Sequence, residues 1–329
     1  MSTIRGVTIV GLLVGACTAN GVSEPQPAGE DAADEPVPAW ARVNVEEQAD
    51  ARTIARHELE GHVAMPATPA AEPLRIVTPV VVALTGVYAG GELLMRLHDG
   101  QLPPDVTPQG DVILALKDAL TPQFTGKGWS ARRIGLFADR RLRFSTLWPV
   151  FRTVEAAGQV SGLQIIVQHP EDPPGAALHS MHPWTDGTLW DGSVRGGSRG
   201  GIGEWEELSQ MQIVLALGAT QFEVGRLMND GTFQPMTTFP RAEGVTELAR
   251  LAERLSKERN PKAYGTFAAL IWADDDLTLG QIVDVMTSLT GPKCTPAERA
   301  TSTSPNCWFV DIALKGRRST LHGLKLDRW

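Results

Sequence analysis

The chain has 329 residues, of which 42% are hydrophobic, so it can bury a core and is neither disordered nor collagen-like. At about 150 residues per domain, this length predicts two domains. The 38 acidic and 30 basic side chains give a formal net charge of -8, which argues against a general nucleic-acid binder because such a protein needs a basic face.

The N-terminus has the pattern of a secretory signal. One cation, Arg5, precedes an apolar run over residues 6–16 that is too short to span a bilayer as a helix. The residues Val14-Gly15-Ala16 before Cys17 resemble the bacterial lipobox, whose cysteine is lipidated and becomes the mature N-terminus. We therefore expect a lipoprotein signal peptide over residues 1–16 and lipidation of Cys17. An ordinary signal peptide is the alternative.

An acidic segment rich in Pro and Ala follows over residues 17–72. Residues 18–62 hold ten acidic and three basic side chains, so most of the net charge lies there. Such a composition buries too little apolar area to offset the entropy of ordering. We expect an extended tether, followed by a nearly neutral folded part.

Two later stretches, residues 73–169 and 209–315, repeat one pattern. Each begins with an apolar strand, Val80–Leu84 in the first copy and Ile213–Leu217 in the second, which align residue by residue. A turn signal and an amphipathic helix follow in both copies.

The second half of the pattern also repeats. Phe137-Ala138-Asp139 ends one strand, and Trp272-Ala273-Asp274 ends another 135 residues later. A polar turn, a helix and a closing strand follow each. The pattern predicts an α+β fold of two tandem small domains, each a mixed sheet with two helices on one face. Chance similarity between two α+β domains is the alternative.

Residues near the start of the second helix of each copy predict how it begins. Thr278 and Gln281 have the spacing of a capping box. In the first copy Ser145 is the expected cap, which would place Pro149 within the first turn, where amide donors are unpaired in any case.

The repeated pattern resembles the periplasmic domain of the ExbD/TolR family of biopolymer-transport proteins. The resemblance rests on the early strand pair, the amphipathic helix, the strand ending in hydrophobic-Ala-Asp, and a second helix ending at Ala156-Ala157-Gly158 before a closing strand over residues 162–167. The second copy lacks the Ala-Gly helix end.

The resemblance implies small α+β domains that dimerise in the periplasm and contact envelope proteins and, in some members, peptidoglycan. Members of the family have a transmembrane helix with a proton-coupling acid; this sequence shows no such helix, so proton coupling is not carried over.

Four residues are candidates for contact with a partner. Asp139 and Asp274 end strands, where exposed acids can face another protein. Alternatively, their carboxylates accept hydrogen bonds from amides of the following turn. Trp184 and Trp190 lie in a Gly- and Trp-rich linker expected over residues 170–208; they are candidates for binding a partner or glycan, with packing as the alternative. Residues 316–329 are the expected C-terminal tail.

With Cys17 lipidated, Cys294 and Cys307 remain as an even pair. In a compartment that permits disulfides they are expected to form one, which would staple a Thr-, Ser- and Pro-rich loop. Two free thiols and metal ligation are the alternatives.

Three other patterns do not meet the requirements of a site. Residues 196–200 fit Gly-x-Ser-x-Gly but lack the preceding strand and following helix of a nucleophile elbow. His57 and His62 are five residues apart, whereas a zinc-protease helix requires four. A loop metal site would require the linker to fold back, and its ligands would come from five residues: His169, His179, His182, Asp172 and Asp186. We expect no catalytic residue, no metal and no cofactor.

Together these observations predict a non-enzymatic envelope lipoprotein that acts as a scaffold or accessory component of an ExbD/TolR-type transport or Tol-like system. Its expected partners are envelope proteins of such a motor, with peptidoglycan as a further candidate. Thr18 after the lipidated cysteine is not aspartate, which in Gram-negative lipoproteins favours the outer membrane. A duplicated domain would mimic the dimer of single-domain relatives. The alternatives are a peptidoglycan- or glycan-binding module and a secreted hydrolase, which would need Ser, His and Asp residues converging at a cleft.

Overall fold

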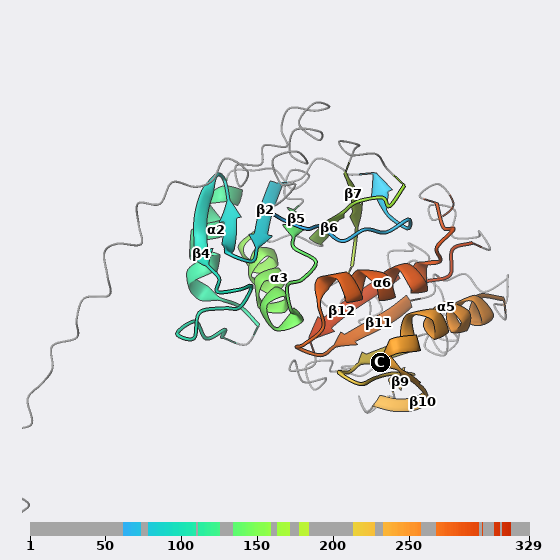
Figure 1. Cartoon of the computed structure of the whole chain (residues 1–329). Helices are drawn as coiled ribbons and strands as arrows, with labels where there is room; N and C mark the ends of the chain where they lie inside the picture. Colours follow the sequence, from blue (N-terminus) through green and yellow to red (C-terminus); the bar gives the residue numbers. More distant parts are fainter. Residues whose placement is uncertain are drawn as a thin grey trace, which may run out of the picture. The chain divides into compact units, whose positions relative to one another are not determined.

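The computed structural model describes residues 62–73, 78–109, 111–125, 134–158, 163–171, 178–183, 213–227, 233–257, 268–295, 298, 306–309 and 311–316. These residues form two mixed β-sheets, each with two α-helices (Figure 1). The predicted α+β fold with two sheet-containing domains is therefore confirmed.

The first domain contains a seven-stranded sheet. Its strands are β1 (Glu72–Pro73), β2 (Thr78–Ala83), β3 (Gly86–Ala89), β4 (Glu92–Arg96), β5 (Ile134–Ala138), β6 (Leu163–Val167) and β7 (His179–Met181). They lie in the order β1-β7-β6-β5-β2-β3-β4. The central pairs β2–β5 and β5–β6 are parallel, and the outer pairs are antiparallel.

The second domain contains a five-stranded sheet. Its strands are β8 (Ile213–Leu217), β9 (Gln221–Leu227), β10 (Phe233–Pro240), β11 (Ala268–Ala273) and β12 (Asp311–Gly316). They lie in the order β10-β9-β8-β11-β12, with β8–β11 and β11–β12 parallel and the two outer pairs antiparallel. Strands β4-β3-β2-β5-β6 of the first sheet follow the same order with the same orientations, so the two domains share one topology.

The hydrogen bonds at the ends of the central strands fix which residues are equivalent. The amide of Asp139 donates to the carbonyl of Val82, and the amide of Asp274 donates to that of Leu217, both at 3.0 Å. Val82 therefore corresponds to Leu217, and the sequence alignment of Val82 with Leu215 was wrong by two residues. A shift of two keeps every side chain on its face of the sheet, so the apolar pattern cannot detect it.

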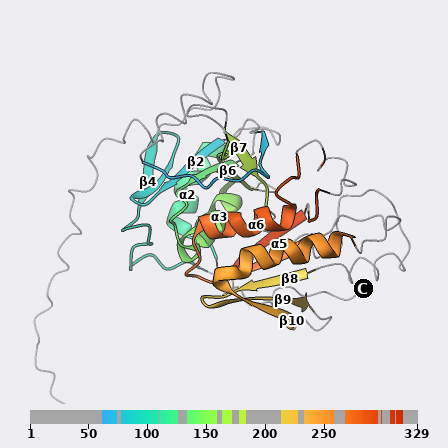
Figure 2. The ribbon, with the colours of Figure 1, turned by 45° about the vertical axis from the view of Figure 1, so that its right-hand side comes forward.

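In each domain both helices pack on one face of the sheet, as the sequence predicted. The helices are α2 (Leu114–Phe124) and α3 (Phe144–Gly158) in the first domain, and α5 (Arg241–Lys257) and α6 (Leu279–Thr290) in the second. Leu120 of α2 and Phe151 of α3 are fully buried in one apolar core with alternate side chains of the sheet, such as Val82. Helices α5 and α6 run side by side in Figure 2.

The opposite face of the first sheet is covered by the chain segment of residues 62–71, which we call the strap. Val63 and Met65 of the strap are buried with Phe137 and Ile166 of the sheet, in an apolar cluster separate from the helix-side core. The predicted tether over residues 17–72 thus ends in a packed segment. Its composition did not indicate this, because a few apolar side chains are averaged with many acidic neighbours.

The first domain also extends into the predicted linker, residues 170–208. Strand β7 lies within that range and pairs with β6, and Leu178 just before it is buried on the strap side of the sheet. Three residues are too short to give an alternating pattern, so the sequence carried no signal of this strand.

Candidate functional site

The carboxylate of Asp139 accepts four hydrogen bonds. It follows β5, and its side chain is 0% exposed. Its Oδ1 accepts hydrogen bonds from the amide and the Nε of Arg141, both at 2.9 Å, and its Oδ2 accepts from Nη2 of Arg141 at 2.7 Å. Oδ2 also accepts from the amide of Ala64 at 3.0 Å.

These bonds determine the charge state of Asp139. Burial by itself would raise the pKa of this carboxyl, but the hydrogen bonds from the Arg141 side chain and from the amides of Arg141 and Ala64 outweigh it, so the pKa lies below its ordinary value. The carboxylate accepts a hydrogen bond from the amide of Arg141 in the following turn, which is the alternative predicted from the sequence for this residue. With no exposed surface it cannot touch a partner in this conformation.

Asp139 also binds the strap to the domain. The amide of Arg140 donates to the carbonyl of Ala64 at 2.7 Å. Ala64 therefore accepts one hydrogen bond from this turn and donates another to Asp139. Further along the strap, the amide of Gln168 donates to the carbonyl of Pro66, and the amide of Thr68 donates to the backbone carbonyl of Gln168, both at 2.9 Å. The strap is therefore attached at the ends of both β5 and β6.

Asp274 occupies the position equivalent to Asp139 but is partly exposed. Its carbonyl accepts from the amide of Leu277 at 3.3 Å, as the carbonyl of Asp139 accepts from Leu142 at 3.0 Å. The turns after β5 and β11 therefore have one geometry.

These two turns pair with each other and form the junction between the domains. The amide of Phe144 donates to the Leu277 carbonyl at 2.7 Å, and the equivalent amide of Leu279 donates to Leu142 at 2.9 Å. A second pair of backbone bonds has the same symmetry. The amide of Ser145 donates to the carbonyl of Asp275 at 3.0 Å, and the amide of Gly280 donates to the carbonyl of Arg140 at 2.9 Å. Every residue in these bonds is 135 positions from its equivalent, so the junction has a local pseudo-two-fold axis.

The junction explains how α3 and α6 begin. The first amides of a helix have no partner inside it, and here the first two amides of each helix donate to carbonyls of the other domain. Helix α3 consequently begins at Phe144, and the prediction that Ser145 caps it was wrong. Helix α6 also has the predicted capping box between Thr278 and Gln281.

Two side-chain contacts accompany the backbone bonds. A Cβ built on Gly316, the last residue of β12, would lie 2.8 Å from Cδ1 of Trp148 in α3, so the indole packs directly on that strand. Trp148 Nε1 is buried and has no hydrogen-bond partner among the described residues. The hydroxyls of Thr68 in the strap and Thr287 in α6 are 2.5 Å apart. The strap therefore contacts the second domain as well as the first.

Ser180 and His182 form a serine–histidine pair beside a carboxylate. Ser180 Oγ is 3.0 Å from Nε2 of His182, and Oε2 of Glu72 is 3.8 Å from the same nitrogen. In a catalytic triad the carboxylate holds the other ring nitrogen, and the serine must reach the substrate. Ser180 is 0% exposed, so this arrangement lacks the geometry of a hydrolase site.

The histidines considered as metal ligands, His169, His179 and His182, do not form a metal-binding group within the described residues. The rings of His169 and His179 have centroids 5.8 Å apart, whereas His182 bonds to Ser180. No group of three or more His, Cys, Asp or Glu side chains within the described ranges could hold a metal ion. Asp172 and Asp186 lie outside those ranges.

Several other sequence predictions also fall outside the described residues. They concern Cys17, Trp184, Trp190, His57 and the Gly-x-Ser-x-Gly segment over residues 196–200. In the part of the chain that the structure does describe, no helix is long and apolar enough to cross a membrane.

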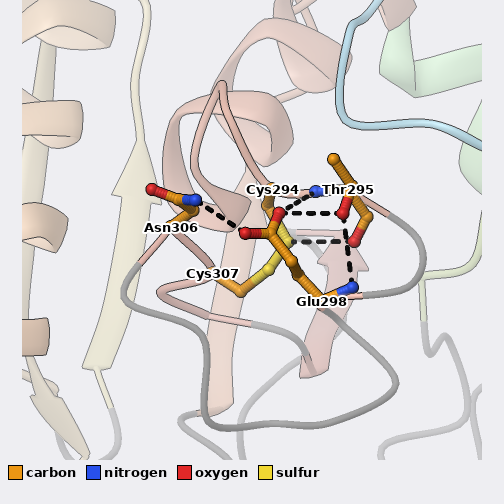
Figure 3. Close-up of a disulfide and its surroundings, with 5 residues drawn as sticks. All are labelled: Cys294, Thr295, Glu298, Asn306 and Cys307. Carbon is orange, nitrogen blue, oxygen red and sulfur yellow. Dashed lines mark hydrogen bonds between the residues drawn. A yellow bond between two sulfur atoms is a disulfide. The ribbon is translucent and has the colours of Figure 1, made fainter.

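Cys294 and Cys307 form the predicted disulfide, with their Cα atoms 4.7 Å apart (Figure 3). The carboxylate of Glu298 lies beside it and accepts from the amide of Thr295 at 2.9 Å and its hydroxyl at 2.8 Å. It also accepts from Nδ2 of Asn306 at 2.6 Å. Glu298 therefore links both ends of the loop that the disulfide closes.

No protein-family model, curated protein or solved structure matches the chain.

Proposed function

We propose that this chain is a non-enzymatic envelope lipoprotein whose two domains form an intramolecular pseudo-dimer. It would act as a scaffold or accessory component of an ExbD/TolR-type transport or Tol-like system. The observation that carries the proposal is the reciprocal capping of α3 and α6 by two domains of one topology. Reciprocal contacts of this kind define a two-fold dimer interface, and here a single chain supplies both halves.

The envelope assignment has a different basis. It rests on the lipobox-like residues before Cys17 and on the disulfide between Cys294 and Cys307, a bond that persists in oxidising compartments such as the periplasm. The transport partner rests on the resemblance of the repeated pattern to the ExbD/TolR periplasmic domain.

Cross-linking in intact cells tests the partner. The full-length chain, tagged at its C-terminus, is cross-linked in cells that express it at its normal level, captured and identified together with its neighbours. We expect proteins of a transport or Tol-like motor. Recovery of none of them contradicts the proposal, and retention on isolated peptidoglycan instead favours the glycan-binding alternative.

Metabolic labelling with a palmitate analogue tests the anchor. We expect the label in the wild type and in the Cys294→Ala/Cys307→Ala variant, which retains Cys17, and no label in Cys17→Ala. The double variant is the matched control because it removes cysteines without touching the lipobox. Label that persists in Cys17→Ala contradicts lipidation at this residue.

A further inference from the structure

The two turns that pair at the junction carry different charges. In the first domain the turn presents three exposed cations, Arg140, Arg141 and Arg143. The equivalent residues of the second domain are Asp275, Asp276 and Thr278. The backbone geometry is thus symmetric, whereas the charges are of opposite sign.

One attraction between opposite charges spans the junction. The carbonyl of Arg140 accepts from the amide of Gly280, and Asp284 lies one helical turn beyond Gly280 on the same side of α6. Partial burial raises the pKa of Asp284, and the Arg140 guanidinium opposes that rise. The cation of one domain therefore lies within electrostatic range of the acid of the other.

The pseudo-symmetry shows what a contact between like domains would bring together. Asp275 is the equivalent of Arg140, and Pro149 is the equivalent of Asp284. Two second domains joined by the same contact would place Asp275 against Asp284, acid against acid. Two first domains would place Arg140 against Pro149, with arginine-rich turns facing each other. Only the unlike pairing sets opposite charges against each other.

We propose that Arg140, Asp284 and Asp275 are the residues that determine which domains pair, so that the junction surface of each domain accepts the unlike copy and rejects its own kind. The partner that each surface fits is therefore the other domain of the same chain. Like-charge repulsion is a general means of suppressing wrong partners. The inference rests on the same contact as the proposed function but not on the envelope partner, so the two can fail separately.

Hydrogen exchange of the full-length chain tests the proposal. The readout is the exchange rate of the four amides that cross the junction, those of Phe144, Ser145, Leu279 and Gly280. The substitution Arg140→Glu places an acid near Asp284. Because the two like charges repel each other, we expect these four amides to exchange at least about tenfold faster than in the wild type. Asp284→Arg alone should also accelerate them. The double variant Arg140→Glu/Asp284→Arg restores an opposite-charge pair and should return the rates to within about threefold of the wild type.

The control is Lys117→Glu on α2, which makes the same change of charge away from the turns and should leave the four rates unchanged. Arg140 is exposed, so we expect its variant to keep the fold, and exchange of amides within β5 and β11 verifies this. Wild-type rates in Arg140→Glu, or a double variant as fast as Arg140→Glu alone, overturn the proposal. A wild-type dimer cross-linked through two Arg140 turns also overturns it.

Discussion

At the scale of single residues, Asp139 connects segments of the chain that lie far apart in the sequence. Its carboxylate binds the turn that follows it and the strap that covers the sheet behind it. A buried charge is stable only when it is paired and hydrogen-bonded, and Asp139 is both. Its sequence context, a polar turn after an apolar strand, indicated the bonds to the turn but not the bond to the distant Ala64.

Replacing Asp139 by Asn should lower the free energy of unfolding by about 1–3 kcal/mol at neutral pH, because the amide cannot replace a carboxylate that accepts four hydrogen bonds. The native pKa of Asp139 is lowered. Its contribution is therefore present above the unfolded-state pKa of about 4 and is lost as the pH falls through the native value.

Urea unfolding from pH 7 down to pH 2 measures this effect. The difference between the wild type and Asp139→Asn should be constant above about pH 5 and should shrink at lower pH. Asp118→Asn on the exposed surface of α2 is the control and should stay within about 0.5 kcal/mol of the wild type. A difference that does not depend on pH would show that the charge of Asp139 is not what stabilises the fold.

At the scale of secondary structure, the chain shows where local signals suffice and where they do not. The capping box of Thr278 and Gln281 lies within four residues, and the sequence predicted it correctly. The start of α3 depends on carbonyls of the second domain, so no local pattern contains it. The equivalence of β2 and β8 was displaced by two residues for a similar reason, since hydrogen bonds to distant strands define it.

Replacing Thr278 by Ala should destabilise the chain by about 1 kcal/mol, because the amide of Gln281 loses its side-chain acceptor. Thr278→Ser retains the hydroxyl and should recover most of the loss. Thermal unfolding compares the two variants, and equal destabilisation by Ala and Ser would show that the methyl group, not the cap, is responsible.

Loss of the disulfide should lower the free energy of unfolding by about 3 kcal/mol, the chain-entropy value for a loop of this size. The test compares Cys294→Ser/Cys307→Ser with the wild type in urea, each with and without a reductant. The reductant should destabilise only the wild type. A reductant-sensitive double variant would mean that another group is being reduced.

At the scale of the whole chain, buried residues of both described domains belong to one apolar core. The junction adds four backbone hydrogen bonds and the packing of Trp148 on Gly316. The sequence predicted two domains of one topology, but it could not predict that they share a core, because that depends on surfaces brought together only by folding.

A shared core predicts that the two domains unfold in a single cooperative transition, seen as one calorimetric peak that coincides with the change in circular dichroism. Gly316→Val should weaken this coupling, since the new side chain would meet the Trp148 ring, and it should lower the transition temperature or split the peak. Gly280→Ala is the control, because its added Cβ would lie at an ordinary 3.4 Å from the nearest atom, the carbonyl oxygen of Arg140. Two separate peaks in the wild type would contradict the shared core.

The strap has a mechanical consequence. Tension that enters the described chain from its N-terminal side reaches the Ala64 bonds to Asp139 and Arg140. The carbonyl of Arg140 is in turn bound to Gly280 of the second domain. A pull on the N-terminal side is therefore transmitted through two adjacent residues, Asp139 and Arg140, to the contact between the domains as well as to the first sheet.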